Sequence, residues 1–180
     1  MVQPRFNRMA LAAPALGLVT ALVALLVYWP ARGNGLVWDD WAVLESLVGP
    51  DAPASRWGAL LQPPADYAAL FRPLTMLTFV LQLWAGHASP LPFHTFNLVL
   101  HSFNVFLAAL VAWQLLGDGY PGRAAAATVC ALAYALHPAL TEPVIWISAR
   151  SDLIMTFWLC IALLADRLLL AKAWLDEDPR

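Results

Sequence analysis

Residues 93–116 read FHTFNLVLHSFNVFLAALVAWQLL and contain no Asp, Glu, Lys or Arg. The hydrocarbon core of a bilayer is about 30 Å thick, and a helix needs ~20 mostly apolar residues to cross it. This run therefore predicts a membrane-spanning helix. The rest of the chain has the same character, since 61% of its 180 residues are hydrophobic and only 12% are charged. Soluble domains carry roughly 45–50% apolar and about 25% charged residues, so the composition predicts an integral membrane protein.

Three further apolar runs predict spans at residues 10–29, 124–136 and 153–171. The first run follows two arginines, as a signal peptide does, but it is longer than the roughly 7–15 residues of a signal h-region. We therefore expect an uncleaved signal-anchor. Residues 74–85 are apolar but too short to cross a bilayer, and they predict a helix that lies in the interface or re-enters it. The expected fold is all-α, a single polytopic membrane domain with about four transmembrane helices.

Lys and Arg residues are distributed unequally over the segments that flank these runs. Six lie in segments 1–9, 117–123 and 166–180, and four lie in the longer segments 30–73 and 137–152. By the positive-inside rule, this predicts cytoplasmic termini and extracytoplasmic loops at 30–73 and 137–152. In a bacterium the membrane would be the cytoplasmic one.

The first outer loop, residues 30–73, has a composition suited to the membrane surface. It carries short apolar stretches that fit amphipathic interfacial helices. Trp38 and Trp41 lie just beyond the first apolar run, where amphipathic rings favour the headgroup level. The lipid bilayer is therefore an expected partner. A net charge of -2 leaves no basic surplus for a nucleic-acid backbone, so nucleic-acid binding is not expected.

Two adjacent carboxylates, Asp39 and Asp40, follow the first span in the sequence Gly35-Leu-Val-Trp-Asp-Asp-Trp41. Neighbouring carboxylates near an apolar interface are partly desolvated and repel each other, which suits a general base or a metal ligand. The structural alternative is a helix N-cap, because an aspartate that opens a helix satisfies free backbone amides. Position alone favours the cap slightly.

Arg72 stands where the first outer loop returns to the membrane. A guanidinium at this place can bind a phosphate with two hydrogen bonds. The commoner role of an interfacial arginine is to extend its charge to the lipid headgroups.

A polar stripe runs along the span at 93–116. His94, Asn97, His101 and Asn104 are spaced by three, four and three residues, so they share one face of a helix. Polar groups in hydrocarbon point to the bundle interior or a cavity. We favour interhelical hydrogen bonding over a ligand or proton role. The two histidines lack further ligands nearby in sequence, so no metal site is predicted.

The second outer loop carries four ionisable side chains that could act in catalysis or substrate binding, namely His137, Glu142, Arg150 and Asp152. Arg150 and Asp152 can pair with each other or cap the last span. Glu142 lies between Thr141 and Pro143 and has no comparably simple structural role.

Four motifs together resemble a known family. They are Trp38-Asp39-Asp40, Phe71-Arg72-Pro73-Leu74-Thr75, Phe93-His94-x-x-Asn97-x-x-x-His101, and His137-Pro138-x-x-Thr141-Glu142-x-x-x-Trp146-Ile147-Ser148-x-Arg150-x-Asp152. Their order and spacing resemble the membrane half of the transmembrane-and-TPR protein O-mannosyltransferases and their bacterial relatives. These proteins belong to the GT-C superfamily of polytopic glycosyltransferases. The resemblance covers roughly residues 30 to 165.

The resemblance implies transfer of a sugar, with mannose as a candidate, from a polyprenyl-phosphate donor to a protein or glycan acceptor on the extracytoplasmic face. Asp39 or Asp40 would be the base or would orient the acceptor, and Glu142 would be the acid of the second loop. The substrate-binding candidates are Arg72, His137, Arg150 and Asp152. The sequence indicates no particular cofactor. Whether the reaction uses a divalent metal is left open.

Two departures from the family pattern bear on activity. GT-C enzymes enclose their donor with more spans than the four expected here, and the TPR array is missing from this sequence. We therefore expect an N-terminal portion of a larger enzyme that needs its remaining part or a partner membrane subunit. The alternative is a non-catalytic four-span scaffold or assembly protein. A transporter or channel subunit is disfavoured, because the acidic groups lie in loops and not in spans.

Overall fold

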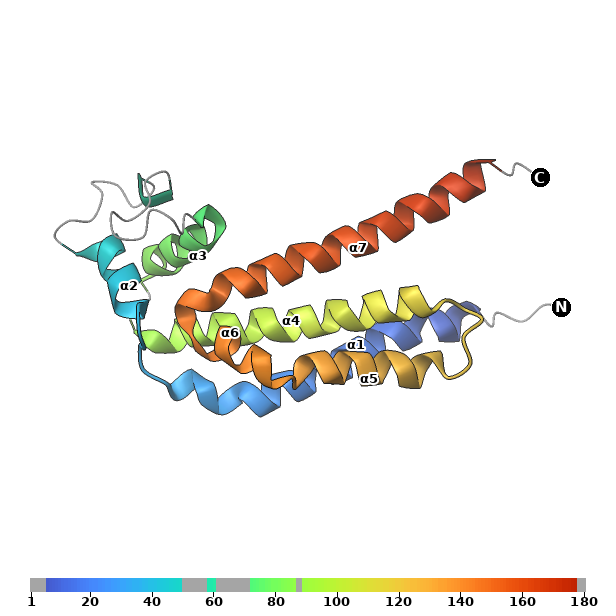
Figure 1. Ribbon diagram of the computed structural model, residues 1–180, viewed down its shortest axis with the longest axis horizontal. Coiled ribbons are helices and arrows are strands. Elements are labelled where there is room, and N and C mark those ends of the chain that lie inside the picture. Colours follow the sequence, from blue (N-terminus) through green and yellow to red (C-terminus); the bar gives the residue numbers. More distant parts are fainter. Residues whose placement is uncertain (1–5, 50–57, 61–71, 87–88, 178–180) are drawn as a thin grey trace. The chain divides into compact units, whose positions relative to one another are not determined.

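The computed structural model describes residues 6–49, 58–60, 72–86 and 89–177. Within these ranges all regular secondary structure is helical (Figure 1). Three stretches are long and apolar enough to cross a membrane, namely Leu11–Gly33, Pro90–Leu116 and Ile147–Arg167. The expected all-α fold of a multi-pass membrane protein is confirmed.

The three long helices coincide with three predicted spans. α1 (Phe6–Tyr28) continues into the 3-10 helix η1 (Trp29–Gly33). α4 (Pro90–Leu116) covers the run at 93–116, and α7 (Arg150–Glu177) covers the run at 153–171. Pro14 lies inside α1 and does not end the helix.

The third predicted span, residues 124–136, is present as a short helix that is followed by a break. α5 (Arg123–Ala135) has 13 residues and ends just before His137-Pro138. The chain continues as η4 (Pro138–Leu140) and α6 (Thr141–Ile145). Proline disfavours a helical conformation at the preceding residue, which explains the break. The described part of the chain therefore has three candidate spans, or four if the broken pair is counted as one.

The predicted short apolar helix is present as α3 (Pro73–Trp84), with 12 residues. It begins with proline at its first position, where the missing N–H costs nothing. It ends before Gly86, whose φ of +83° is a conformation that glycine adopts readily. The other short elements are α2 (Asp40–Val48), η2 (Gly58–Leu60) and η5 (Ile147–Ala149).

The chain divides into two compact units. Unit 1 comprises Met1–Val27, His101–Leu140 and Met155–Arg180, and unit 2 comprises Tyr28–Leu100 and Thr141–Ile154. The single polytopic domain expected from the sequence stays a prediction.

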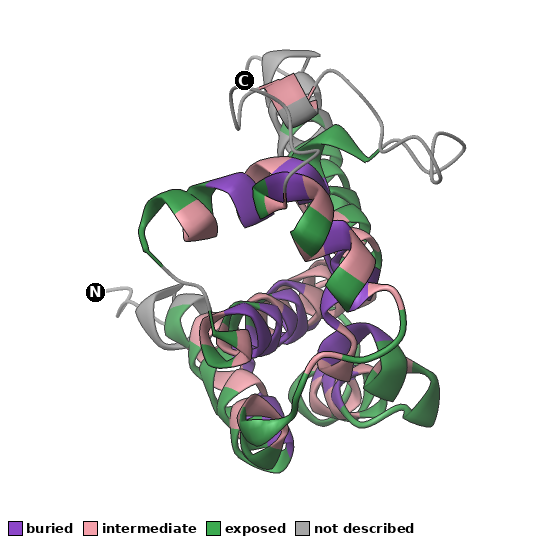
Figure 2. Cartoon of the chain, turned by 90° about the vertical axis from the view of Figure 1, so that its left-hand side faces the viewer, coloured by how far each residue is buried: buried purple, intermediate pink, exposed green. Residues whose placement is uncertain are grey.

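Unit 1 is built from membrane-type helix packing. α1 and the second part of α4 approach closely at Gly17, because a Cβ there would lie 2.8 Å from Phe106 Cδ2. A small cluster of buried residues, Ala24, Val105 and Ala135, joins α1, α4 and α5. Large apolar residues on α1 such as Leu18 and Leu26 are each 63% exposed, and Figure 2 shows the burial class of the residues along the chain. Small residues at contacts and exposed leucines on the outer face are typical of helices in lipid.

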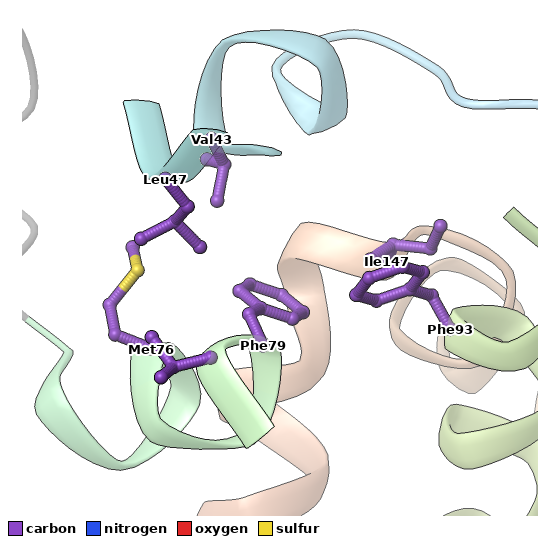
Figure 3. Close-up of a cluster of buried hydrophobic side chains, with 7 residues drawn as sticks. Val43, Leu47, Met76, Phe79, Phe93 and Ile147 are labelled. Atoms are coloured by element: carbon purple, nitrogen blue, oxygen red, sulfur yellow. The ribbon is translucent and has the colours of Figure 1, made fainter. Parts of the chain in front are cut away.

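Unit 2 has an apolar core of its own (Figure 3). Val43 and Leu47 lie one turn apart on α2 and face α3, whose buried side chains include Phe79. Phe93 from the start of α4 and Ile147 from η5 complete the cluster. This core fixes α2 against α3 and η5 and so positions the two residues at the beginning of α2.

Candidate functional site

The carboxylate of Asp40 is wholly buried, and both of its oxygens accept hydrogen bonds. Its Oδ1 atom accepts hydrogen bonds from the Ser148 backbone N (2.8 Å) and Oγ (2.7 Å). Its Oδ2 atom accepts a bond from the Val37 backbone N (3.0 Å). A buried carboxylate is tolerated only when hydrogen bonds replace its hydration, and here three of them do so. Asp40 therefore joins the start of α2 to η5.

Asp39 has a different environment, although it is the next residue. It occupies the N-cap position of α2, but its side chain makes no capping hydrogen bond. Instead, Asp39 Oδ1 accepts a hydrogen bond from Trp146 Nε1 (3.0 Å), and the residue stays partly exposed. The capping alternative therefore does not describe what this carboxylate does.

Trp38 stands directly before the two carboxylates. Its φ of +50° makes it the one described residue other than glycine with a positive φ. Its side chain is 73% exposed, and its ring lies perpendicular to that of Trp146, with 4.9 Å between the ring centroids. The aromatic pair and the Asp39 carboxylate thus share one partner, Trp146.

Arg150 is the largest wholly buried side chain among the described residues. Its guanidinium donates four hydrogen bonds to neutral oxygens: to Asn97 Oδ1 (2.6 Å), Thr78 Oγ1 (2.8 Å), Gln82 Oε1 (2.7 Å) and the Phe93 carbonyl (3.1 Å). Thr78 and Gln82 belong to α3, while Asn97 and Phe93 belong to α4. Arg150 therefore ties the first turn of α7 to two other helices.

Aromatic rings surround the same guanidinium. Its central carbon lies 4.4 Å from the ring centroid of Phe79 and 4.5 Å from that of Phe96. An aromatic face attracts a cation, and the attraction is stronger away from water. In the described part of the chain the only ion pair within 4 Å joins Arg123 to Asp118, so hydrogen bonds and rings provide the close stabilisation of Arg150.

The polar stripe on α4 is divided between the two units. In unit 2, His94 Nε2 donates to the Gly35 carbonyl (3.2 Å), and Asn97 Nδ2 donates to the Trp146 carbonyl (3.1 Å). In unit 1, His101 Nε2 donates to the Ala135 carbonyl of α5 (3.1 Å), and Asn104 is buried. The bond from His101 to α5 is of the interhelical kind that the spacing favoured, whereas His94 bonds to a loop carbonyl. A ligand or proton role stays a prediction.

The remaining predicted site residues are exposed. Arg72 precedes α3, Glu142 lies in the first turn of α6, and Asp152 lies in the first turn of α7, where it accepts a bond from Ser151 Oγ (3.3 Å). His137 belongs to unit 1, and its Nδ1 accepts a bond from the Ala139 N (3.2 Å).

Neither Arg72 nor Glu142 forms a hydrogen bond or ion pair with Asp39 or Asp40 within the described residues. The substrate-binding roles of Arg72, His137, Arg150 and Asp152, and the acid role of Glu142, stay predictions. Among the described residues no group of three or more His, Cys, Asp and Glu side chains is placed to hold a metal ion. Whether a divalent metal takes part stays open.

Several residues that build the site were not singled out from the sequence. Trp146 and Ser148 belong to the quoted motif but were assigned no role. Thr78 and Gln82 are polar residues four apart in a mostly apolar helix, whose other polar residue is Thr75. That spacing is itself a signal, because polar groups on one face of an apolar helix need a partner.

Comparison with known proteins finds several relatives that are similar in sequence and carry the same kind of name. The chain is 32% identical over 155 residues to "Protein O-mannosyl-transferase Tmtc1" of Drosophila melanogaster, covering 81% of this chain and 17% of that protein. It is 27% identical over 157 residues to the human "Protein O-mannosyl-transferase TMTC3", covering 83% of this chain and 16% of that protein. The resemblance to protein O-mannosyl-transferases is confirmed. No family model and no solved structure matches the chain.

The segment aligned with protein O-mannosyl-transferases spans the positions of the two adjacent carboxylates. An aligned segment that covers 81% of a 180-residue chain contains Asp39 and Asp40 wherever it begins. A third relative, the mouse "Protein O-mannosyl-transferase TMTC2", is 28% identical over 155 residues and again has 82% of this chain aligned. The chain spans less than a fifth of the length of each of these three proteins.

Proposed function

We propose that this chain forms part of a membrane glycosyltransferase in which Asp39 is the catalytic base. The observation that carries the proposal is the contrast between the two adjacent carboxylates. Asp40 is buried and accepts three hydrogen bonds, whereas Asp39 is partly exposed and has one oxygen bound to Trp146. A group that must take a proton from a substrate needs an accessible oxygen, and Asp39 meets that need.

The reaction follows from the resemblance to protein O-mannosyl-transferases. A hydroxyl group of the protein or glycan acceptor gives its proton to Asp39, and its oxygen attacks the anomeric carbon of the donor sugar, with mannose as the expected sugar. The bond between that carbon and the phosphate oxygen breaks, and polyprenyl phosphate leaves with the bonding electrons. Attack from the face opposite the phosphate inverts the anomeric carbon. The site would lie on the extracytoplasmic side of the membrane.

The other residues take distinct roles in this account. Asp40 and Ser148 hold the start of α2, and so set the position of Asp39. Arg150 fixes α3 and α4 around the beginning of α7, and its hydrogen bonds to four neutral oxygens suit an organising role. Arg72 is exposed at the start of α3 and is the better placed candidate for the donor phosphate, whose charge grows as the bond breaks.

The test is sugar transfer by the protein at its full encoded length in membranes. Labelled polyprenyl-phosphate mannose and acceptor are supplied, and the Asp39→Asn variant is compared with Glu45→Gln, which changes an exposed carboxylate on α2. We expect Asp39→Asn to lose at least about 100-fold in rate, as removal of a general base does, and Glu45→Gln to match the unmodified protein.

Undiminished transfer by Asp39→Asn rejects the assignment. The scaffold alternative predicts a different pattern. In that case Asp39→Asn changes nothing, while His94→Leu and His101→Leu alter which membrane proteins co-purify with the chain.

A further inference from the structure

Trp38 has an unusual combination of backbone strain and exposure. A φ of +50° lies in the left-handed region, where a bulky L-residue is rare and costs free energy. The side chain held in this conformation is not buried, since 73% of it is exposed. A strained residue persists only where its surroundings enforce it, and such residues gather at functional sites.

The strained backbone conformation of Trp38 accompanies a specific contact of its side chain. The conformation places the Trp38 ring at right angles to the Trp146 ring, with 4.9 Å between centroids. Edge-to-face pairing at this distance is a favourable aromatic geometry. Because Trp146 also donates its Nε1 hydrogen to Asp39, one residue holds both the exposed indole and the proposed base.

Trp146 is itself fixed on its backbone side. Its carbonyl accepts a hydrogen bond from Asn97 Nδ2 (3.1 Å), and its N donates to the Glu142 carbonyl (2.8 Å). Hydrogen bonds and the ring contact therefore connect α4 and α6 through Trp146 to Trp38 and Asp39. An exposed aromatic surface that is held beside a carboxylate is suited to place a substrate ring next to the reacting group.

We propose that the indole of Trp38 is the sugar-binding surface of this site and stacks against the pyranose ring of the hexose on the donor. The face of an indole is electron-rich, and the axial C–H groups on one side of a hexose carry partial positive charge. Stacking buries that apolar side and leaves the hydroxyl groups free for hydrogen bonds. This inference rests on the proposed function, and it adds the residue that recognises the sugar part of the donor.

The competing explanation is that Trp38 anchors the loop at the lipid headgroups, as interfacial tryptophans do. Trp41 provides a matched comparison, because it is 65% exposed and lies in the first turn of α2. An anchoring role is independent of the sugar. Stacking on the sugar affects the sugar-bearing lipid alone.

The experiment measures equilibrium binding of two lipids to the full-length protein in nanodiscs, polyprenyl-phosphate mannose and polyprenyl phosphate without the sugar. The variants are Trp38→Leu, Trp38→Phe and Trp41→Leu. For Trp38→Leu we expect about tenfold weaker binding of the mannose-bearing lipid, in line with the ~1.4 kcal/mol that a tenfold change represents. Its binding of polyprenyl phosphate should change less than about twofold, which corresponds to about 0.4 kcal/mol. Trp38→Phe should keep most of the affinity, and Trp41→Leu should match the unmodified protein for both lipids.

Two results overturn the proposal. One is unchanged binding of the mannose-bearing lipid by Trp38→Leu, and the other is an equal loss for both lipids, which indicates anchoring. Asp39→Asn separates this test from that of the proposed function, because it should bind the mannose-bearing lipid normally and fail to transfer the sugar. Normal transfer by Asp39→Asn rejects the catalytic role, whereas normal binding by Trp38→Leu rejects the stacking role alone.

Discussion

Ser148 donates two hydrogen bonds to a single oxygen of Asp40, one from its backbone N (2.8 Å) and one from its hydroxyl group (2.7 Å). The two residues are 108 positions apart in the chain. This contact brings the first outer loop of the predicted topology onto the second. It makes Asp40 part of the framework of the site, and it leaves Asp39 as the carboxylate with access to a substrate.

Asp40→Asn should destabilise unit 2. An asparagine can keep its oxygen on Ser148, but its NH₂ group would then face the Val37 N–H, so two donors would oppose each other. A buried donor without an acceptor costs about 1–3 kcal/mol. Thermal unfolding in detergent should show a lower Tm for Asp40→Asn than for Asp39→Asn. Equal Tm values for the two variants would contradict the framework role.

Arg150→Lys should be strongly destabilising although it preserves the charge. A lysine ammonium is compact and cannot reproduce a planar set of hydrogen bonds to α3 and α4. Each lost bond from a charged donor costs roughly 1.5–3 kcal/mol, so we expect a loss of at least about 2 kcal/mol in unfolding free energy. If Arg150 instead served chiefly to bind the donor phosphate, Arg150→Lys would keep the Tm and lose transfer alone.

In contrast to Arg150→Lys, Arg72→Gln should impair donor binding without lowering stability. Arg72 is exposed, and exposed substitutions rarely alter stability. We expect an unchanged Tm together with a KM for polyprenyl-phosphate mannose raised about tenfold, as expected for the loss of one charge-assisted phosphate contact. A KM equal to that of the unmodified protein would remove Arg72 from the donor site.

Gly17→Val should weaken the packing of unit 1. A Cβ at Gly17 would lie 2.8 Å from Phe106 Cδ2 and 3.2 Å from the Phe106 carbonyl oxygen. Overpacking of this kind costs about 1–3 kcal/mol. Gly33→Val is the control, since nothing lies within 4 Å of a Cβ at that position. The Tm should fall for the first variant only.

The sequence predicted the helices well, because their limits are set by local signals. The end of α5 was expected from His137-Pro138, and α3 was expected as a short apolar helix that ends before Gly86. These effects act within a few residues, where proline and glycine restrict or free the backbone. The break between α5 and η4 also follows from a local proline.

The different environments of Asp39 and Asp40 could not be predicted from local sequence signals. It depends on Trp146 and Ser148, which are 107 and 108 residues further along the chain. Local pattern slightly favoured a capping role for one of the two aspartates, yet the side chain of Asp39, which occupies the N-cap position, makes no capping bond. Similarly, Arg150 was a candidate for phosphate binding or local pairing, and its neutral partners on α3 and α4 become visible only once those helices are placed.

The catalytic role of Asp39 is tested by comparing Asp39→Asn and Asp40→Asn in the full-length protein, with transfer from polyprenyl-phosphate mannose measured per molecule of folded protein. We expect Asp39→Asn to fold with the Tm of the unmodified protein and to lose at least about 100-fold in transfer rate. We expect Asp40→Asn to lose stability, while its folded fraction keeps most of the activity. Full transfer by folded Asp39→Asn protein would rule out Asp39 as the catalytic base.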